Sequence, residues 1–325
     1  MTSRTFAAWV VRRLAVAAAV VAGVAVVTFV LIHLAPGDPI YLLAGDGGSP
    51  AYYADMRARY GLDRPLPAQL ATYLAAVLTL DFGYSFVHQA PVSRVLLAHA
   101  PASLLLGGAA LALATAAGLF AGVLPALTRS LAVDRVVRWG ASITYASPVF
   151  WTGQIFVYVF AVRLGILPAA GITTARETLT GLAAGGDVLR HLLLPALTLS
   201  LPFAAIIARV VRAALVEIAR EPFVLATSAR GFSRARVLLG HAVPNVLPPV
   251  VTLVGLHAAQ LAAGAALIEA LFGWPGVGHL VLQASLHRDY PLVVGAFIGI
   301  SASVVFFNAA ADAVCAWLDP RVRQT

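Results

Sequence analysis

The amino-acid sequence predicts an all-α membrane protein with six transmembrane helices, and three observations support that fold class. The 325 residues are 60% hydrophobic and only 11% charged, with a mean hydropathy of +0.88, unlike the composition of a soluble domain. Several uncharged apolar runs reach the length of about 20 residues that a helix needs to cross a bilayer. Arginines are concentrated between alternate runs, which is typical of cytoplasmic connections in membrane proteins.

The first apolar run extends from Leu14 to Leu34 and is predicted to be an uncleaved membrane span. A cleaved signal peptide has a shorter apolar core of about 7–15 residues, followed by a cleavage site of small residues. Here the turn-forming sequence Ala-Pro-Gly-Asp-Pro follows instead, at residues 35–39. Five later runs predict the remaining spans, which are Ala100–Leu127, Gly140–Val162, Leu192–Arg209, Val246–Phe272 and Leu292–Leu318.

The arginines also predict which side of the membrane each connection faces. Because six spans is an even number, both termini should lie on the same side. Most of the 22 arginines fall at the N-terminus, in the connection 129–138, in the long loop 210–249 and in the C-terminal tail. Since arginine is enriched in cytoplasmic connections, these segments and both termini are predicted to be cytoplasmic.

The predicted organisation has three parts. Residues 1–34 form the cytoplasmic N-terminus and the first transmembrane helix, and residues 35–98 form an extracytoplasmic segment. Residues 99–325 form a core of five transmembrane helices, to which the cytoplasmic loop 210–249 belongs. Proline is a candidate to kink a membrane helix, and the predicted spans contain it at Pro148, Pro195 and Pro202.

Composition argues against several classes of protein. The sequence contains no lysine, so it lacks the P-loop lysine that contacts nucleotide phosphates in ATP-hydrolysing proteins. The net charge of +8 does not indicate nucleic-acid binding, because the arginines are spread among hydrophobic spans rather than gathered on one polar face. The single cysteine, Cys315, cannot form an intrachain disulfide or a cysteine-based metal cluster. We therefore predict no catalytic residue, metal or cofactor in this chain.

The extracytoplasmic segment is predicted to contain one amphipathic helix. After Pro67, apolar residues recur at the helical spacing i, i+3, i+4, i+7 and i+8, and the sequence Asp81-Phe-Gly-Tyr-Ser85 then ends the helix. The apolar positions are Leu70, Tyr73, Leu74, Val77 and Leu78. This pattern fits either a lid that packs on the membrane helices or a contact surface for a soluble protein that delivers substrate.

The long cytoplasmic loop is predicted to hold a short helix that lies across the membrane face. Pro222 can begin this helix, and Gly231 can end it after Arg230, because glycine tolerates the left-handed conformation of a helix end. Ser233 can cap the next turn. The apolar residues with a charged rim fit docking into a groove of another protein, but they also fit an amphipathic helix resting on lipid.

The loop is similar to the EAA-type coupling motif of ABC-importer permeases. Leu225-Ala-Thr-Ser-Ala-Arg-Gly231 matches the helix and its terminal glycine, and Val243-Pro244 matches the closing Leu-Pro, although Leu225 stands where the general motif has glutamate. Nearly the whole chain resembles the peptide/nickel permease family. Further matching fragments, in order, are Leu34-Ala-Pro-Gly-Asp-Pro39, Gly61-Leu-Asp-Arg-Pro-Leu-Pro67, Asp81-Phe-Gly-Tyr-Ser85, Arg163-Leu-Gly-Ile-Leu-Pro168, His191-Leu-Leu-Leu-Pro195, Phe272-Gly-Trp-Pro-Gly276, Arg288-Asp-Tyr-Pro291 and Asp319-Pro-Arg321.

This resemblance implies a permease subunit of an ATP-driven, binding-protein-dependent importer in the cell (inner) membrane. Its expected cargo is di- or oligopeptides, with nickel chelates or glutathione-like compounds as alternatives. The expected partners are the lipid bilayer, a second permease chain, an extracytoplasmic substrate-binding protein, and P-loop ATPase subunits that bind ATP and magnesium. The residues expected to couple this chain to the ATPase are Arg220, Phe223, Val224, Ala226, Thr227, Arg230, Gly231, Arg234 and Pro244.

Polar side chains within the predicted spans are candidates for the translocation path, because charged and polar groups at membrane depth are costly. His257 and Gln260 share a helix face at spacing i, i+3. The other candidates are Glu269, Asn308 and Asp312. Hydrogen bonds between helices are the alternative role for all of these residues.

Other classes of membrane protein fit the sequence less well. A stand-alone secondary transporter is favoured by inverted repeats or a charged relay within the spans, and neither is evident. An intramembrane enzyme needs a catalytic constellation at membrane depth, and His33, Asp38 and His257 lack such spacing. A scaffold protein is compatible with the composition but does not explain the cytoplasmic loop.

Overall fold

The structure is a computed structural model that describes residues 3–34, 40, 48–60, 62–174 and 180–318. The chain divides into two compact units. The first unit comprises Met1–Ser103 and Pro275–Phe306, and the second comprises Leu104–Trp274 and Phe307–Thr325. Two long helices contribute residues to both units, namely α5 (Val92–Thr128) and α14 (Tyr290–Leu318).

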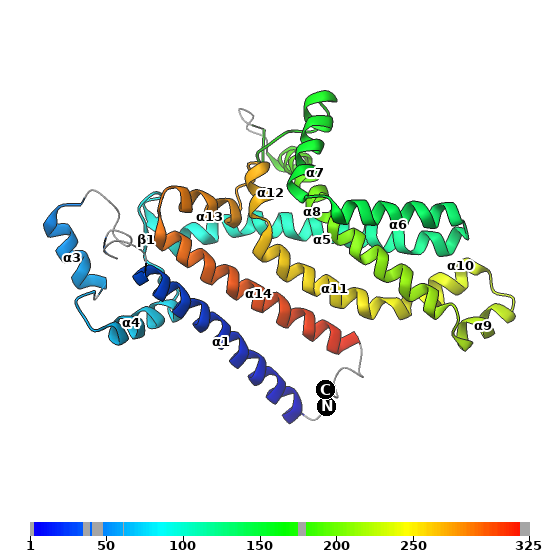
Figure 1. Ribbon diagram of the computed structural model, residues 1–325, viewed down its shortest axis with the longest axis horizontal. Coiled ribbons are helices and arrows are strands. Elements are labelled where there is room, and N and C mark those ends of the chain that lie inside the picture. Colours follow the sequence, from blue (N-terminus) through cyan, green and yellow to red (C-terminus); the bar gives the residue numbers. More distant parts are fainter. Residues whose placement is uncertain (1–2, 35–39, 41–47, 61, 175–179, 319–325) are drawn as a thin grey trace. The chain divides into compact units, whose positions relative to one another are not determined.

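Almost all of the described secondary structure is helical (Figure 1). The other elements of the first unit are α1 (Ser3–Leu34), α3 (Pro50–Tyr60), α4 (Leu66–Leu78), β1 (Tyr84–Ser85), β2 (Ala90–Pro91) and α13 (Val277–Leu286). Those of the second unit are α6 (Leu131–Ala146), α7 (Val149–Phe156), the π-helix η1 (Val157–Arg163), α8 (Gly181–Ile218), α9 (Pro222–Ala229), α10 (Arg234–Val237), the π-helix η2 (Leu238–Ala242), α11 (Val243–Gly264) and α12 (Ala266–Leu271).

Four runs within the described residues are long and apolar enough to cross a membrane. They lie in α5, in α8, along α10–η2–α11 and in α14, and the pair formed by α6 and α7–η1 gives a fifth if it counts as one span. The apolar part of α1, Ala15–Leu31, is shorter. The six predicted apolar runs therefore fall on helices, while the count of six spans and the position of the termini stay predictions.

The predicted span 140–162 is broken rather than straight. Helices α6 and α7–η1 meet at an angle of 104°. Ser147, just before Pro148, has an extended backbone with ψ of 132°, because the proline ring disfavours the helical conformation of the preceding residue. Pro195 and Pro202, in contrast, lie inside the continuous helix α8.

In the first unit, α4 packs against α1, as the lid interpretation expects. Val77 is buried in a cluster with Ala25 and Ile298, and the hydroxyl oxygens of Thr28 and Tyr73 are 3.2 Å apart. The predicted apolar face is partly wrong, because Leu78 is 86% exposed at the helix end. The polar Gln69, near the start of α4, is buried and donates to the carbonyl of Arg64 at 2.8 Å.

A buried serine–aspartate pair joins two distant parts of the first unit. Strands β1 and β2 form an antiparallel hairpin, and the hydroxyl of Ser85 in β1 donates to a carboxylate oxygen of Asp289. Asp289 also stands at the start of α14, where its other carboxylate oxygen accepts from the N–H of Leu292 at 3.4 Å. Both side chains are buried, so the hairpin and the helix start share one hydrogen-bonded anchor.

In the second unit, α5 and α8 pack with very small side chains at their contact. A Cβ atom added at Gly118 would lie 2.6 Å from the Cβ of Ile207, and one added at Gly122 would lie 2.6 Å from that of Val211. Around this contact is a hydrophobic cluster from α5, α8, η2 and α11, whose buried members are Val123, Ile207, Val211, Leu215, Leu238, Ala242, Val246 and Val250.

Candidate partner-docking site

The loop after α8 forms the helix that the sequence predicts. Helix α9 begins at Pro222 and ends at Ala229, and the N–H of Arg230 donates to the carbonyl of Ala226 at 3.2 Å. Gly231 follows with a φ of +84°, the left-handed conformation that ends many helices. The prediction of a short helix stopped by this glycine is therefore confirmed.

Helix α9 leaves part of its apolar surface uncovered. Phe223 is 42% exposed and Ala226 is exposed, whereas Val224 is only 7% exposed. The predicted contact face is thus reduced to Phe223 and Ala226, because Val224 packs against its own chain. Thr227 donates its hydroxyl to the carbonyl of Phe223 at 2.7 Å, and the side chain of Leu225 lies outside the described residues.

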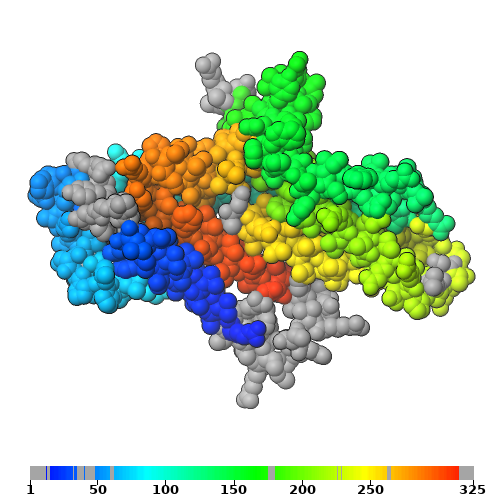
Figure 2. Space-filling model, viewed as in Figure 1, coloured from blue at the N-terminus to red at the C-terminus, as the bar shows by residue number. Residues whose placement is uncertain are grey.

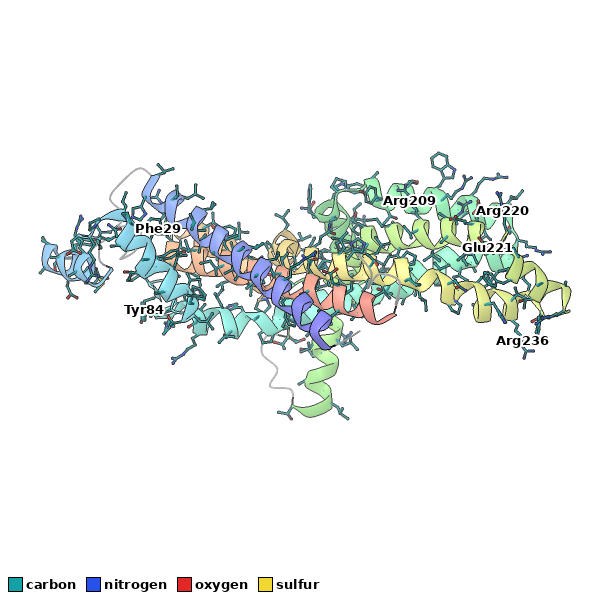
Figure 3. All side chains as sticks on the ribbon, turned by 90° about the horizontal axis from the view of Figure 1, so that it is seen from below. Phe29, Tyr84, Arg209, Arg220, Glu221 and Arg236 are labelled. Atoms are coloured by element: carbon teal, nitrogen blue, oxygen red, sulfur yellow. The ribbon has the colours of Figure 1, made fainter. Side chains whose placement is uncertain are left out.

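The surface around α9 is rich in arginine. In Figure 1, α9 and α10 lie together at one end of the second unit, and in Figure 2 the yellow-green atoms of this segment are at the surface. Figure 3 labels Arg220, Glu221 and Arg236 at this end of the unit, and Arg209 farther back along α8. Arg220 and Arg230 are exposed, as predicted for a charged rim.

Arg234, the third predicted rim residue, contacts its own chain instead. Its Nε donates to the carbonyl oxygen of Ala126 at 2.7 Å, and an Nη of the same guanidinium donates to that oxygen too. Ala126 belongs to the last turn of α5, where carbonyl groups have no partner within the helix. Arg234 therefore acts as a side-chain cap for the C-terminal end of α5.

The chain on either side of α10 is held by local contacts. Ser233 precedes α10 as predicted, but its side chain makes no capping hydrogen bond. The guanidinium of Arg236 lies 5.7 Å from the ring centre of Phe232. Pro244 is the second residue of α11, directly after the π-helix η2, and it is exposed.

An arginine–aspartate ion pair lies close to the loop in the chain. Arg212, in the last part of α8, donates through Nε and Nη2 to the two carboxylate oxygens of Asp134, the latter at 2.9 Å. Asp134 is in the first turn of α6, and the hydroxyl of Ser130 caps that helix by accepting from the N–H of Val133 at 3.3 Å. A bidentate arginine–carboxylate pair fixes both distance and orientation.

The polar residues proposed for a translocation path are only partly brought together. His257 is 2% exposed, lies with its ring centre 4.4 Å from that of Phe203, and has Nδ1 3.1 Å from the side-chain oxygen of Gln260. Gln260 itself is exposed. Glu269 is buried in α12, while exposed Asn308 and half-buried Asp312 lie one turn apart on α14. Among the described residues, no group of three or more His, Cys, Asp or Glu could hold a metal ion.

Besides the contact of Arg234 with Ala126, three further structural contacts were not predicted from the sequence. Gly118 and Gly122 form a G-x-x-x-G pattern in an apolar run, a recognisable signal for close helix packing. The pairs Ser85–Asp289 and Asp134–Arg212 leave no such signal, because their members are 204 and 78 residues apart.

The apolar helices define the class of this chain, a multi-pass helical membrane protein with an uncovered helical loop. The chain belongs to the family of binding-protein-dependent transport system inner membrane components, whose model matches residues 114–324. A second model, for the N-terminal part of such membrane components, matches residues 6–107. The inner-membrane location and the permease class predicted from the sequence are therefore confirmed.

Curated relatives match the chain along nearly its full length. It is 32% identical over 333 residues to the dipeptide transport system permease protein DppB of Escherichia coli K12, covering 97% of this chain and 98% of the relative. It is 36% identical over 330 residues to the di/tripeptide transport system permease protein DppB of Pseudomonas aeruginosa, with the same coverage. It is 37% identical over 318 residues to the probable D,D-dipeptide transport system permease protein DdpB of E. coli K12, covering 93% and 94%.

A solved structure has the same fold. A chain of the MetNI methionine ABC transporter, in inward-facing conformations, matches with a TM-score of 0.51 and 18% identity. The match covers 70% of this chain and 97% of that chain. The predicted all-α fold of ABC-importer permease type is therefore confirmed.

Proposed function

We propose that this permease imports di- or oligopeptides and forms half of the translocation pathway. The observation that carries the proposal is the near-full-length identity to permeases named for dipeptide and di/tripeptide transport. Nickel chelates and glutathione-like compounds were alternatives on the sequence, and the relatives' names favour peptides over both. A stand-alone transporter is disfavoured by membership of a binding-protein-dependent family.

Helix α9 is the proposed docking element for a separate ATPase subunit. Its exposed Phe223 supplies an apolar anchor, and the exposed Arg220 and Arg230 supply a charged rim. An aromatic anchor surrounded by polar groups is the arrangement that commonly dominates binding energy at protein interfaces. Gly231, with its positive φ, lets the chain change direction after Ala229, so that α9 is a separate short helix.

In this proposal the chain performs no covalent chemistry. The partner ATPase subunits bind ATP and magnesium, and their closure moves α9, which shifts the helices between inward- and outward-facing arrangements. A second permease chain supplies the other half of the pathway, and an extracytoplasmic binding protein releases peptide into it. The absence of lysine supports this division of labour, because a P-loop cannot be completed within the chain.

The first test is gentle affinity purification of this chain from its native membrane, followed by identification of the companions and an ATPase assay. We expect a second multi-span permease and P-loop ATPase subunits to be recovered together. Recovery of the chain without an ATPase, even after cross-linking, would contradict the docking role of α9.

The substrate is tested by reconstituting that complex in proteoliposomes with its binding protein. Uptake of a radiolabelled dipeptide and tripeptide is compared with uptake of a nickel–histidine chelate and of glutathione. ATP-dependent accumulation of the peptides supports the proposal. Accumulation of only the chelate or of only glutathione would assign the importer to a different cargo.

A further inference from the structure

Two side-chain contacts flank α9 in the chain, one to the end of α5 and the other to the start of α6. Before α9, Arg212 of α8 binds Asp134 at the start of α6. After α9, Arg234 of α10 binds the carbonyl of Ala126 at the end of α5. We propose that these contacts are braces that transmit movement of α9 to the α5–α6 hairpin, and that Arg212, Asp134 and Arg234 are positioning residues for energy coupling. This inference rests on the proposed docking role of α9.

The first brace, Arg212–Asp134, has the geometry of a rigid link. Two guanidinium nitrogens meet two carboxylate oxygens, and the side chains are only 29% and 21% exposed. Because a planar fork binds a planar carboxylate, the contact resists twisting as well as separation. Arg138 also approaches Asp134, at 3.4 Å, but it lies on the same helix and is 55% exposed, so it cannot connect two helices.

The second brace joins α10 to the end of α5. Arg234 is the first residue of α10, and it follows the turn at Gly231 by three positions. The C-terminal end of a helix carries a partial negative charge, which attracts the guanidinium in addition to the hydrogen bonds. Movement of the chain at Gly231 is therefore passed to the last turn of α5.

The elements between the braces are packed too closely to move independently. The cluster around Val123 and Val211 joins α5 to α8, and Leu238 and Val246 add η2 and α11 to it. The absence of a side chain at Gly122 lets the backbone of α5 come close to Val211 of α8. Energetic coupling between distant sites needs such a contiguous packed element with a defined partner contact at its end.

The braces predict a specific loss of coupling. In the reconstituted complex, Asp134→Asn and Arg234→Ala should each lower peptide uptake per ATP hydrolysed by at least about fivefold, a typical size for a coupling effect. Recovery of the ATPase with the variant complex should stay at the wild-type level. Exchanging the charges, with Asp134→Arg combined with Arg212→Asp, should restore part of the lost uptake.

A matched control is available next to the first brace. Arg138→Gln removes the other arginine near Asp134 and should leave uptake per ATP unchanged. Wild-type uptake per ATP in the two brace variants would overturn the proposal. Loss of folding or of ATPase binding in those variants, in place of uncoupling, would also overturn it, because the contacts would then be structural supports. Failure of the wild-type chain to bind any ATPase would instead refute the docking role of α9.

Discussion

At the scale of single residues, Asp289 has the clearest structural role. Its carboxylate accepts a hydrogen bond from the hydroxyl of Ser85 and another from the N–H of Leu292 in the first turn of α14. Asp289 is only 3% exposed. The two residues belong to the fragments Asp81–Ser85 and Arg288–Pro291, which the sequence identified only as separate motifs. The structure gives a physical reason for both motifs, because one supplies the donor, Ser85, and the other the acceptor, Asp289, of a buried hydrogen bond.

Replacing Asp289 should destabilise the protein. Asp289→Ala leaves the buried hydroxyl of Ser85 without its acceptor and removes the cap of α14, so we expect a loss of about 2–3 kcal/mol in unfolding free energy. Thermal unfolding of the purified chain in detergent measures this loss. Asp63→Ala, at an exposed position, is the control, and equal midpoints for the two variants would contradict the anchoring role.

Gly231 is the residue on which the turn after α9 depends. Gly231→Pro should abolish peptide uptake while leaving membrane insertion intact, because proline fixes φ near −65° and the turn requires +84°. Uptake in proteoliposomes and the amount of protein in the membrane are measured together. The control is Gly240→Ala, where an added Cβ meets nothing within 4 Å and φ is not positive. Normal uptake by Gly231→Pro would remove the turn from the coupling mechanism.

At the scale of elements, the contact between α5 and α8 depends on the absence of side chains. The G-x-x-x-G spacing places Gly118 and Gly122 on one face, one turn apart, against Ile207 and Val211 one turn apart on α8. The backbones can therefore approach closely over a full turn. Close approach of this kind stabilises helix pairs in a bilayer, where the hydrophobic effect gives no preference between lipid and protein contact.

Filling that contact should be costly. Gly122→Val places a Cβ 2.6 Å from the Cβ of Val211, so we expect destabilisation of about 1–3 kcal/mol from overpacking. The matched control is Gly108→Val in the same helix, where a Cβ meets nothing within 4 Å. Thermal unfolding midpoints compare the two variants. A Gly122→Val protein as stable as the Gly108→Val protein would show that the helices separate easily.

At the scale of the whole molecule, the chain is one component of a larger assembly, and α9 offers the proposed attachment point. Phe223→Asp should lower recovery of the ATPase subunits with this chain by about tenfold, which corresponds to ~1.4 kcal/mol of binding free energy. Quantitative pull-down from membranes measures the recovery. Tyr84→Asp, at an aromatic position in β1 with the same 42% exposure as Phe223, controls for the loss of an exposed aromatic side chain. Equal recovery in both variants would place the ATPase contact elsewhere.

The sequence predicted well those features that depend on local chemistry. Helix α9 follows from Pro222 and Gly231, and the break before α7 follows from Pro148, since proline and glycine act on their own backbone. The contact of Arg234 with Ala126 could not be predicted, because the sequence does not tell whether an arginine beside a helix faces a partner protein or the end of α5. The burial of Gln69 and exposure of Leu78 depend on where α4 ends relative to α1, which periodicity alone does not fix.

The π-helix η2 has a consequence for the direction of Arg234. Its last bond runs from the N–H of Val243 to the carbonyl of Leu238, five residues earlier, so this turn holds one residue more than an α-helical turn. Each residue of an α-helix advances the direction of the side chain by about 100°. Deleting Gly240 would keep every side chain of the brace, yet it would rotate Arg234 by about that angle away from Ala126. The brace therefore depends on the direction of the Arg234 side chain as well as on its chemistry. The single extra residue in the η2 turn sets that direction relative to the end of α5.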